Sequence, residues 1–221
     1  MTPRQLPLAL GFHERFGRED FLAGPSNAGA LALIDRWPDW PAPAVALVGP
    51  EGSGKSHLAA VWAEIAGARS IASHAVAPAA LPTALATGAL VVEDLRPGAC
   101  EEAALFHLLN LAREAGAYLL ITARASPAGW PVALRDLGSR LRALPVVTLA
   151  PPDDVLLRAV LVKLFADRQL AVDESLIGYV ATRIERSFAA ARTVVDELDR
   201  EALRQKREVN RALAVQLLRD R

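Results

Sequence analysis

The sequence predicts an α/β fold in which a parallel sheet lies between two layers of helices, followed by a smaller all-helical lid. Two observations predict the three-layer αβα part. A phosphate-loop motif stands between a strand pattern and a helical pattern, and further short apolar runs alternate with helical patterns. A third observation predicts the helical part, because strand patterns stop after two consecutive prolines.

Length and composition fit this fold. A chain of 221 residues is long enough for one main domain with a small appendage and a sizeable core. Apolar residues make up 52% but aromatic residues only 5%, so the core must consist mainly of Ala, Leu and Val. The 25 basic residues balance the 25 acidic ones, so net charge gives no argument for a nucleic-acid or anionic-membrane partner. The single cysteine, Cys100, excludes an intramolecular disulfide and fits a reducing cytosol.

Short apolar runs bounded by Gly, Pro or charged residues are the predicted strands. They lie at 44–49, 89–94, 118–122 and 145–149. Helical patterns separate them, which predicts parallel strands covered on both faces.

Two segments resemble membrane or targeting signals only superficially. The stretch from Ala75 to Val92 is uncharged, but it contains three helix-breaking residues and is rich in alanine, so it predicts a short helix followed by a strand. The N-terminal "LPLALGF" runs directly into charged residues without a small-residue cleavage site. We therefore expect a cytoplasmic protein without a membrane partner.

The chain changes character at "APPDD" (150–154). Two prolines end the preceding segment, and Asp153 or Asp154 can cap a helix. We expect about four helices from there to Arg221, with Ser187 and Asn210 as the N-caps of the last two. The predicted organisation is a tail at 1–12, an α/β core at 13–150 and a helical lid at 151–221.

The strongest chemical signal is "GPEGSGKSH" (49–57), which fits the phosphate-loop pattern G-x-x-x-x-G-K-[ST]. In this pattern backbone N–H groups and the lysine surround nucleotide phosphates, and the hydroxyl helps to hold magnesium. The following helix adds the positive field of its N-terminus. We expect the whole loop to bind nucleotide: Gly49, Pro50, Glu51, Gly52, Ser53, Gly54, Lys55, Ser56 and His57.

A second signal is "LVVEDL", an apolar strand that ends in Glu93 and Asp94. Folds with a phosphate loop place carboxylates here to hold magnesium and to polarise the attacking water. Acidic pairs after apolar strands are also common as simple strand ends, but the upstream loop favours the functional interpretation. The predicted magnesium residues are therefore Ser56, Glu93 and Asp94, with both carboxylates as catalytic candidates.

These motifs, in order, resemble those of the AAA+ domain of bacterial DnaA-type replication initiators. The resemblance rests on "DFLAGPSNAGALALIDRW" (20–37), "GPEGSGKSHL", "LVVEDL", "EEAALFHLLNLAREAGAYLLITARASP" (101–127) and "LRDLGSRLRALPVVTLAPPDD" (134–154). It covers nearly the whole chain. It implies a P-loop AAA+ fold with ADP or ATP and magnesium as cofactors, and it adds Asn27, in the turn that begins at Gly24, to the nucleotide site.

The sequence lacks both DNA-binding features of the initiators. No helix-turn-helix segment follows the predicted lid, whereas initiators carry one to read double-stranded DNA. Initiators also insert helices that grip single-stranded DNA, but the stretch 75–88 at that place contains no Lys or Arg for phosphate contacts. We expect no direct sequence-specific DNA binding.

The N-terminal "RQLPLALGF" resembles the short peptide that docks on the DNA polymerase III sliding clamp, with Gln5, Leu6, Leu8 and Leu10 as the clamp-binding residues. The alternative is a segment that folds back on the core. Combined with an AAA+ core, the tail is similar to that of the Hda-like regulatory inactivators of DnaA. The implied partners are the clamp and the AAA+ domain of DnaA.

Arg140, in "GSRL", aligns with the arginine finger of the family. The resemblance implies that it enters the nucleotide site of a neighbouring subunit and stabilises charge on the phosphoryl oxygens. One alternative is a surface arginine paired with Asp136, and another is that Arg142 has the role. The implied contact is head-to-tail, and a homo-oligomer is possible.

Three departures from the family pattern affect cleavage and sensing more than phosphate binding. Glu93 replaces the usual Asp, and its longer side chain shifts the carboxylate. Arg124 stands where initiators tend to have an Asp that senses the γ-phosphate, while Thr122 remains a polar contact. The sensing arginine of the lid falls on Ala189, and Arg192, one turn further on the same helical face, is its potential replacement.

The sequence thus predicts a nucleotide-bound regulator, with ADP as the expected nucleotide and at most weak intrinsic ATPase activity. It would bind the clamp and stimulate ATP hydrolysis by DnaA in trans, which limits re-initiation of replication. One alternative is a self-sufficient ATPase of the helicase-loader type, for which the purified chain would show sustained turnover. The other is a non-catalytic clamp-binding adaptor, for which loss of Lys55 would be harmless.

Overall fold

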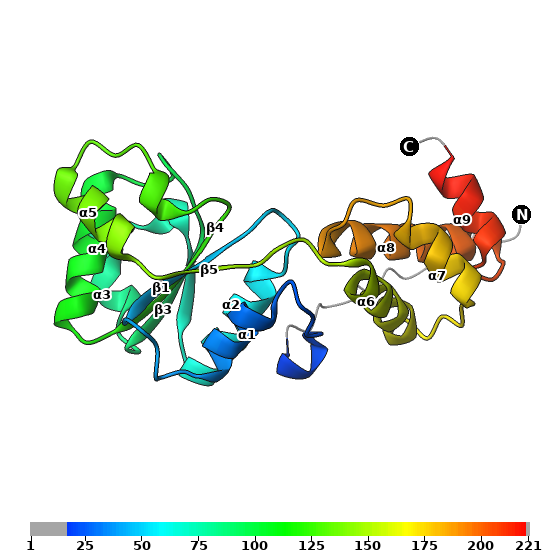
Figure 1. Cartoon of the computed structure of the whole chain (residues 1–221), viewed down its shortest axis with the longest axis horizontal. Coiled ribbons are helices and arrows are strands. Elements are labelled where there is room, and N and C mark those ends of the chain that lie inside the picture. Colours follow the sequence, from blue (N-terminus) through cyan, green and yellow to red (C-terminus); the bar gives the residue numbers. More distant parts are fainter. Residues whose placement is uncertain (1–16, 220–221) are drawn as a thin grey trace, which may run out of the picture.

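The computed structural model of the chain describes residues 17–219. In this range a parallel five-stranded sheet lies between two helical layers, and a bundle of helices follows it (Figure 1). The predicted class, a three-layer αβα core followed by a helical lid, is confirmed.

The sheet has the strand order β2-β3-β4-β1-β5, and every neighbouring pair is parallel. Its strands are β1 (Ala44–Val48), β2 (Arg69–Ala72), β3 (Ala89–Leu95), β4 (Tyr118–Ala123) and β5 (Val146–Thr148). The predicted strands are all present, but β2 was missed. Of its residues only Ile71 is partly buried, because β2 is an edge strand, so it lacks the apolar run that identifies the others.

Helices cover both faces of the sheet (Figure 1). One face carries α1 (Ala28–Asp35) and α2 (Lys55–Ala66), and the other carries α3 (Leu81–Ala84), α4 (Glu102–Glu114) and α5 (Arg135–Ala143). The connections include the 3₁₀ turns η1 (Arg18–Asp20), η2 (Ser73–Ala75), η3 (Pro78–Ala80) and η4 (Pro127–Gly129). Side chains alternate along each strand, so Val45 and Leu47 pack toward α2 while Ala46 and Val48 pack toward α4.

The lid consists of α6 (Asp154–Asp167), α7 (Glu174–Ala181), α8 (Phe188–Gln205) and α9 (Arg211–Leu218). These helices bury a hydrophobic cluster of their own. The predicted caps are confirmed: Ser187 accepts the N–H of Ala190 at 3.1 Å and Asn210 accepts that of Leu213 at 3.0 Å. At the first lid helix the cap is Asp153.

Lid and core meet at the phosphate loop. The backbone N–H of Phe188, at the start of α8, donates to the carbonyl of Gly52 at 2.8 Å. On the linker to α6, the N–H of Ala150 donates to the carbonyl of Ser26 at 3.0 Å. The lid therefore contacts the core through the segment that the sequence assigns to nucleotide binding.

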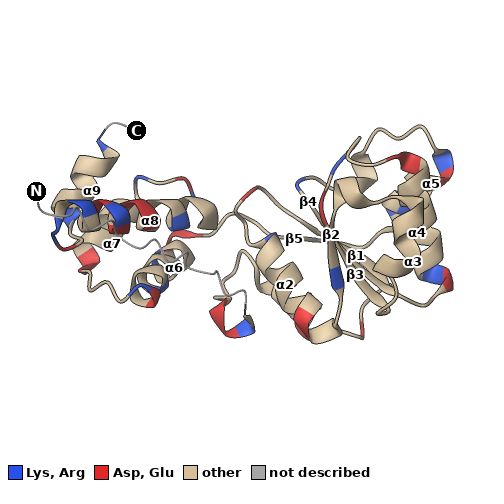
Figure 2. Cartoon of the chain, turned by 180° about the vertical axis from the view of Figure 1, so that it is seen from behind, with Lys and Arg blue, Asp and Glu red and all other residues tan. Residues whose placement is uncertain are grey.

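Charged residues of both signs are interspersed along the lid helices (Figure 2). Within residues 17–219, no helix is both long enough and apolar enough to cross a membrane.

Candidate functional site

The phosphate loop connects β1 to α2, and its glycines are required by its backbone. A Cβ atom at Gly49 would lie 2.4 Å from the carbonyl oxygen of Leu149 and 2.8 Å from Oγ of Ser53. Gly52 and Gly54 have φ angles of 72° and 94°, which side-chain-bearing residues rarely adopt. The loop therefore has the tightly curved form that leaves backbone N–H groups for an anion.

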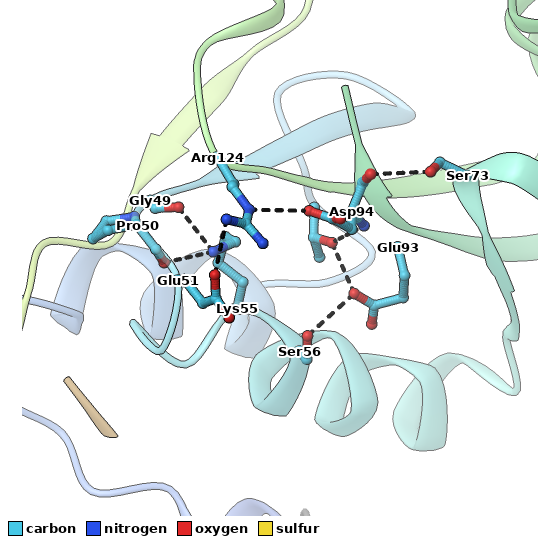
Figure 3. Close-up of polar contacts among 10 residues, drawn as sticks. Gly49, Pro50, Glu51, Lys55, Ser56, Ser73, Glu93, Asp94 and Arg124 are labelled. Carbon is cyan, nitrogen blue, oxygen red and sulfur yellow. Dashed lines mark hydrogen bonds and ion pairs between the residues drawn. The ribbon is translucent and has the colours of Figure 1, made fainter. Parts of the chain in front are cut away.

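Lys55, the first residue of α2, has its side chain folded back over the loop. Its Nζ donates to the carbonyls of Gly49 at 2.8 Å and Pro50 at 2.7 Å (Figure 3). Burial lowers the pKa of Lys55, and the nearby guanidinium of Arg124 lowers it further. Among the described residues, Oγ of Ser53 is buried without a hydrogen-bond partner. An ammonium group and a spare hydroxyl inside a glycine-shaped loop are donors that fit nucleotide phosphates.

Ser56 and Glu93, two of the predicted magnesium residues, are in contact. Oγ of Ser56 donates to Oε2 of Glu93 at 3.3 Å (Figure 3), and Oγ1 of buried Thr122 donates to the same oxygen at 2.8 Å. Magnesium in nucleotide sites binds one or two carboxylates, phosphate oxygens and waters, so a serine hydroxyl beside a glutamate fits it. The residues 17–219 contain no group of three or more His, Cys, Asp and Glu side chains that could hold a metal without such additional ligands.

Asp94 has an unusual backbone conformation. Its φ is 49°, and the pairing of β3 with β4 shifts register between Val92 and Leu95. Asp94 N–H donates to Oγ1 of Thr122 at 2.9 Å, and its carbonyl accepts from Oγ of Ser73 at 3.0 Å. This bulge gives Glu93 and Asp94 separate partners at the end of the strand.

Arg124 joins the loop to β3, whereas the sequence alone showed it only as a departure from the Asp that senses the γ-phosphate in initiators. Its Nη1 lies 2.8 Å from Oε2 of Glu51, and its Nε lies 3.5 Å from Oδ1 of Asp94 (Figure 3). The three side chains are 55%, 72% and 51% exposed, so these ion pairs are accessible to solvent. The signal for a contact was that sensing position itself, at the carboxyl end of β4, where ligands bind in open parallel sheets.

On its lid side, the loop faces the N-terminus of α8. A Cβ atom at Gly52 would lie 2.9 Å from Cβ of Ser187 and 3.0 Å from Cβ of Ala189. A cavity of about 470 Å³ lies here, lined by Glu51 and by lid residues that include Ala189. Arg192, the predicted substitute for the sensing arginine, is half-buried on α8 and does not line this cavity.

The structure gives Asn27 and His57, two predicted nucleotide contacts, partners within the protein. Asn27 is buried, accepts the N–H of Gly24 at 2.9 Å and donates to the carbonyl of Leu22 at 2.9 Å. Nε2 of buried His57 lies 3.0 Å from the carbonyl oxygen of Gly17. Both side chains therefore hold the segment that precedes α1.

Arg140 lies on α5, on the side of the core away from the lid (Figure 1). Its guanidinium carbon lies 5.2 Å from the ring centre of Phe106, and no ion pair joins it to Asp136 in the described part of the chain. Arg142 donates to Oγ of Ser139 at 3.1 Å. The structure does not bring Arg140 to the phosphate loop of its own chain. The predicted clamp-binding residues, Gln5 to Leu10, lie outside the described residues.

The sequence matches no family model and no curated protein. Among solved structures, domain III of the replication initiation protein DnaA from Thermotoga maritima is similar over 93% of this chain and 96% of its own, with a TM-score of 0.77 and 19% identity. Replication initiator DnaA bound to AMPPCP and single-stranded DNA is similar over 85% of this chain and 67% of its own (TM-score 0.65, 16% identity). A RuvB variant of Thermotoga maritima is similar over 86% and 66% (TM-score 0.67, 14% identity). The chain therefore shares its fold with DnaA domain III and with RuvB.

Proposed function

We propose that the chain is an AAA+ regulator of a DnaA-type replication initiator. With ADP and magnesium bound, it attaches to the DNA polymerase III sliding clamp through its tail and stimulates ATP hydrolysis by DnaA, which limits re-initiation. One observation carries the proposal: a DnaA-like core holds a phosphate loop on its lid side and Arg140 on α5, away from the lid.

Different residues of the proposed site would bind the phosphates and the magnesium ion. The backbone of 49–54 and the ammonium of Lys55 would hold the phosphates, and Ser56 and Glu93 would hold magnesium. Magnesium supplies positive charge that neutralises the phosphate oxygens. Asp94 is paired with Arg124 rather than free to polarise water, which supports a nucleotide switch over a motor.

Arg140 is suited to act on a second protein. Its guanidinium packs on an aromatic face, and no carboxylate pairs with it in the described part of the chain, so its charge is available to a phosphoryl group. In a head-to-tail contact, α5 of this chain would face the nucleotide of DnaA.

The test is the hydrolysis of ATP pre-bound to DnaA, with and without the chain and DNA-loaded clamp. We expect faster hydrolysis only when both are present. Sustained turnover by the chain alone, unaffected by clamp, supports a helicase-loader type ATPase instead. Clamp binding without any stimulation of hydrolysis, unchanged in a Lys55→Ala variant that no longer binds nucleotide, supports the adaptor.

The tail is tested separately from the nucleotide site. We expect Gln5→Ala combined with Leu6→Ala to abolish clamp binding, because the motif loses its polar anchor and one apolar contact. Nucleotide affinity should not change. Surface plasmon resonance on immobilised clamp measures the first and calorimetry the second, with Thr2→Ala combined with Pro3→Ala as the control. Clamp binding that survives the Gln5 and Leu6 changes contradicts the assignment.

A further inference from the structure

We infer that Arg124 is a second phosphate-binding cation of this site, which exchanges its ion pair with Glu51 for the terminal phosphate of a nucleoside triphosphate while its Nε stays beside Asp94. The inference rests on the proposed nucleotide binding and identifies the residue that distinguishes triphosphate from diphosphate. It concerns a set of three side chains from the loop, β3 and the end of β4, defined here as the ionic latch: Glu51, Asp94 and Arg124.

The latch lies at the mouth of the phosphate loop. Glu51 belongs to the loop itself, and Asp94 follows Glu93, whose carboxylate contacts Ser56. Arg124 therefore connects the two edges between which the phosphates would lie (Figure 3). It is also close enough to Lys55 to disfavour the charged form of that lysine. The positive charges of Lys55 and Arg124 thus lie close together at the phosphate loop, and two neighbouring cations favour the binding of an anion between them.

Both cations now use oxygen atoms of the protein. Lys55 donates to two loop carbonyls, and Arg124 pairs with two carboxylates. The carboxylate pairs are exposed, and exposed ion pairs contribute little to stability in water. Phosphate offers more negative charge and several oxygens that a planar guanidinium can bind as a fork. Arg124 can thus exchange Glu51 for phosphate at low cost.

Competition within the latch gives the inference a distinctive consequence. If Arg124 must leave Glu51 to bind phosphate, then Glu51 weakens triphosphate binding. Removal of the Glu51 charge should strengthen binding, and it should do so through Arg124. A general change in electrostatic potential would instead act whether or not Arg124 is present.

The experiment is calorimetry of ADP and AMPPCP binding, with magnesium, to the wild-type chain, Arg124→Gln, Glu51→Gln and the double variant. We expect Arg124→Gln to weaken AMPPCP binding roughly tenfold or more, because a charge-assisted contact is lost, and to weaken ADP binding much less. Glu51→Gln should strengthen AMPPCP binding several-fold, and this gain should vanish in the double variant. Arg69→Gln, an exposed arginine at the start of β2, is the matched control and should change neither affinity.

Two results overturn the inference while leaving nucleotide binding intact. One is unchanged AMPPCP affinity in Arg124→Gln, and the other is a gain from Glu51→Gln that persists in the double variant. Arg124→Lys keeps the charge without the fork, so intermediate affinity supports the inference and wild-type affinity contradicts the fork contact. If the wild-type chain binds neither nucleotide, the proposed function itself is wrong.

Discussion

At the end of β3, two adjacent carboxylates have different surroundings. Glu93 accepts hydrogen bonds from Ser56 and Thr122, whereas Asp94 lies beside Arg124. In a regular strand, neighbouring side chains point to opposite faces of the sheet. The bulge at Asp94, where the pairing of β3 with β4 shifts register, interrupts this alternation. In the proposed function Glu93 would hold magnesium, while Asp94, the other carboxylate, is paired with Arg124.

This arrangement predicts a low rate of ATP turnover. We expect the pure chain to bind adenine nucleotide but to hydrolyse ATP below about 1 s⁻¹, the lower limit of typical enzymes. Glu93→Gln should weaken magnesium-dependent binding, because a metal ligand loses its charge. Phosphate release and calorimetry measure these quantities, with Glu64→Gln on the exposed surface of α2 as the control. Rapid steady turnover that Glu93→Gln or Asp94→Asn abolishes is incompatible with the switch.

Local sequence patterns indicate some of these residues and not others. The motif spacing identifies Lys55, because glycine-rich phosphate loops are a local feature of the chain. The partners of Asn27 lie within a few residues, but nothing in the pattern shows that its side chain is fully used by them. The ion pair between Glu51 and Arg124 joins distant segments, so it depends on the order of strands in the sheet.

At the level of elements, one carboxylate joins α4 to the start of α5. Glu102 accepts the backbone N–H groups of Ala133 at 2.9 Å and Leu134 at 2.8 Å, just before the helix that carries Arg140. These hydrogen bonds lower the pKa of Glu102 below its ordinary 4.5. Ionised Glu102 therefore acts as a cap for α5.

We expect Glu102→Ala to speed hydrogen exchange of the Ala133 and Leu134 amides at pH 7. The pKa of Glu102 is lowered in the folded state, so its contribution is complete above about 4.5 and is lost as the pH falls through the folded-state value. The difference from wild type should accordingly shrink in acid. Glu101→Ala, which removes the neighbouring exposed carboxylate, is the control. Equal exchange in Glu102→Ala and wild type at pH 7 shows that α5 needs no such cap.

Gly52 is where the loop and α8 meet. Its φ is 72°, and an added Cβ would lie 2.9 Å from Cβ of Ser187. We expect Gly52→Ala to lower the free energy of unfolding by about 1–2 kcal/mol, since alanine is strained at this φ and the lid must shift. Gly29→Ala in α1 meets no atom within 4 Å and should be neutral or stabilising, as alanine favours helix. Urea unfolding measures both, and equal stabilities of the two variants contradict close lid–loop packing.

Elements with strong local signals were predictable. The central strands are continuous apolar runs, and Ser187 and Asn210 carry the side chains that cap helices. The sequence patterns did not predict β2, because an edge strand needs few apolar residues once β3 provides its hydrogen bonds. Its formation is a tertiary effect.

At the level of the whole molecule, the phosphate loop lies where the core meets the lid, and α5 lies on the side of the core away from the lid (Figure 1). A change at the loop can therefore reach the lid through the contact of Gly52 with Phe188. Under the proposed function, the half-buried arginine on α5 would act on another molecule at the same time. Sequence order alone shows neither relationship, since both arise from how the strands and helices pack.

The most direct test of the role of Arg140 measures the rate at which DnaA hydrolyses its bound ATP in the presence of DNA-loaded clamp. The rate is compared after addition of the wild-type chain, Arg140→Ala or Arg142→Ala. We predict that Arg140→Ala folds, binds nucleotide and binds clamp like wild type, but that its stimulation falls at least about tenfold, because finger arginines contribute about 10³ to 10⁵ in well-studied systems. Arg140→Lys should restore little, since lysine lacks the planar fork. Arg142→Ala should stimulate like wild type. Undiminished stimulation by Arg140→Ala, or its loss in Arg142→Ala alone, would contradict the assignment of Arg140.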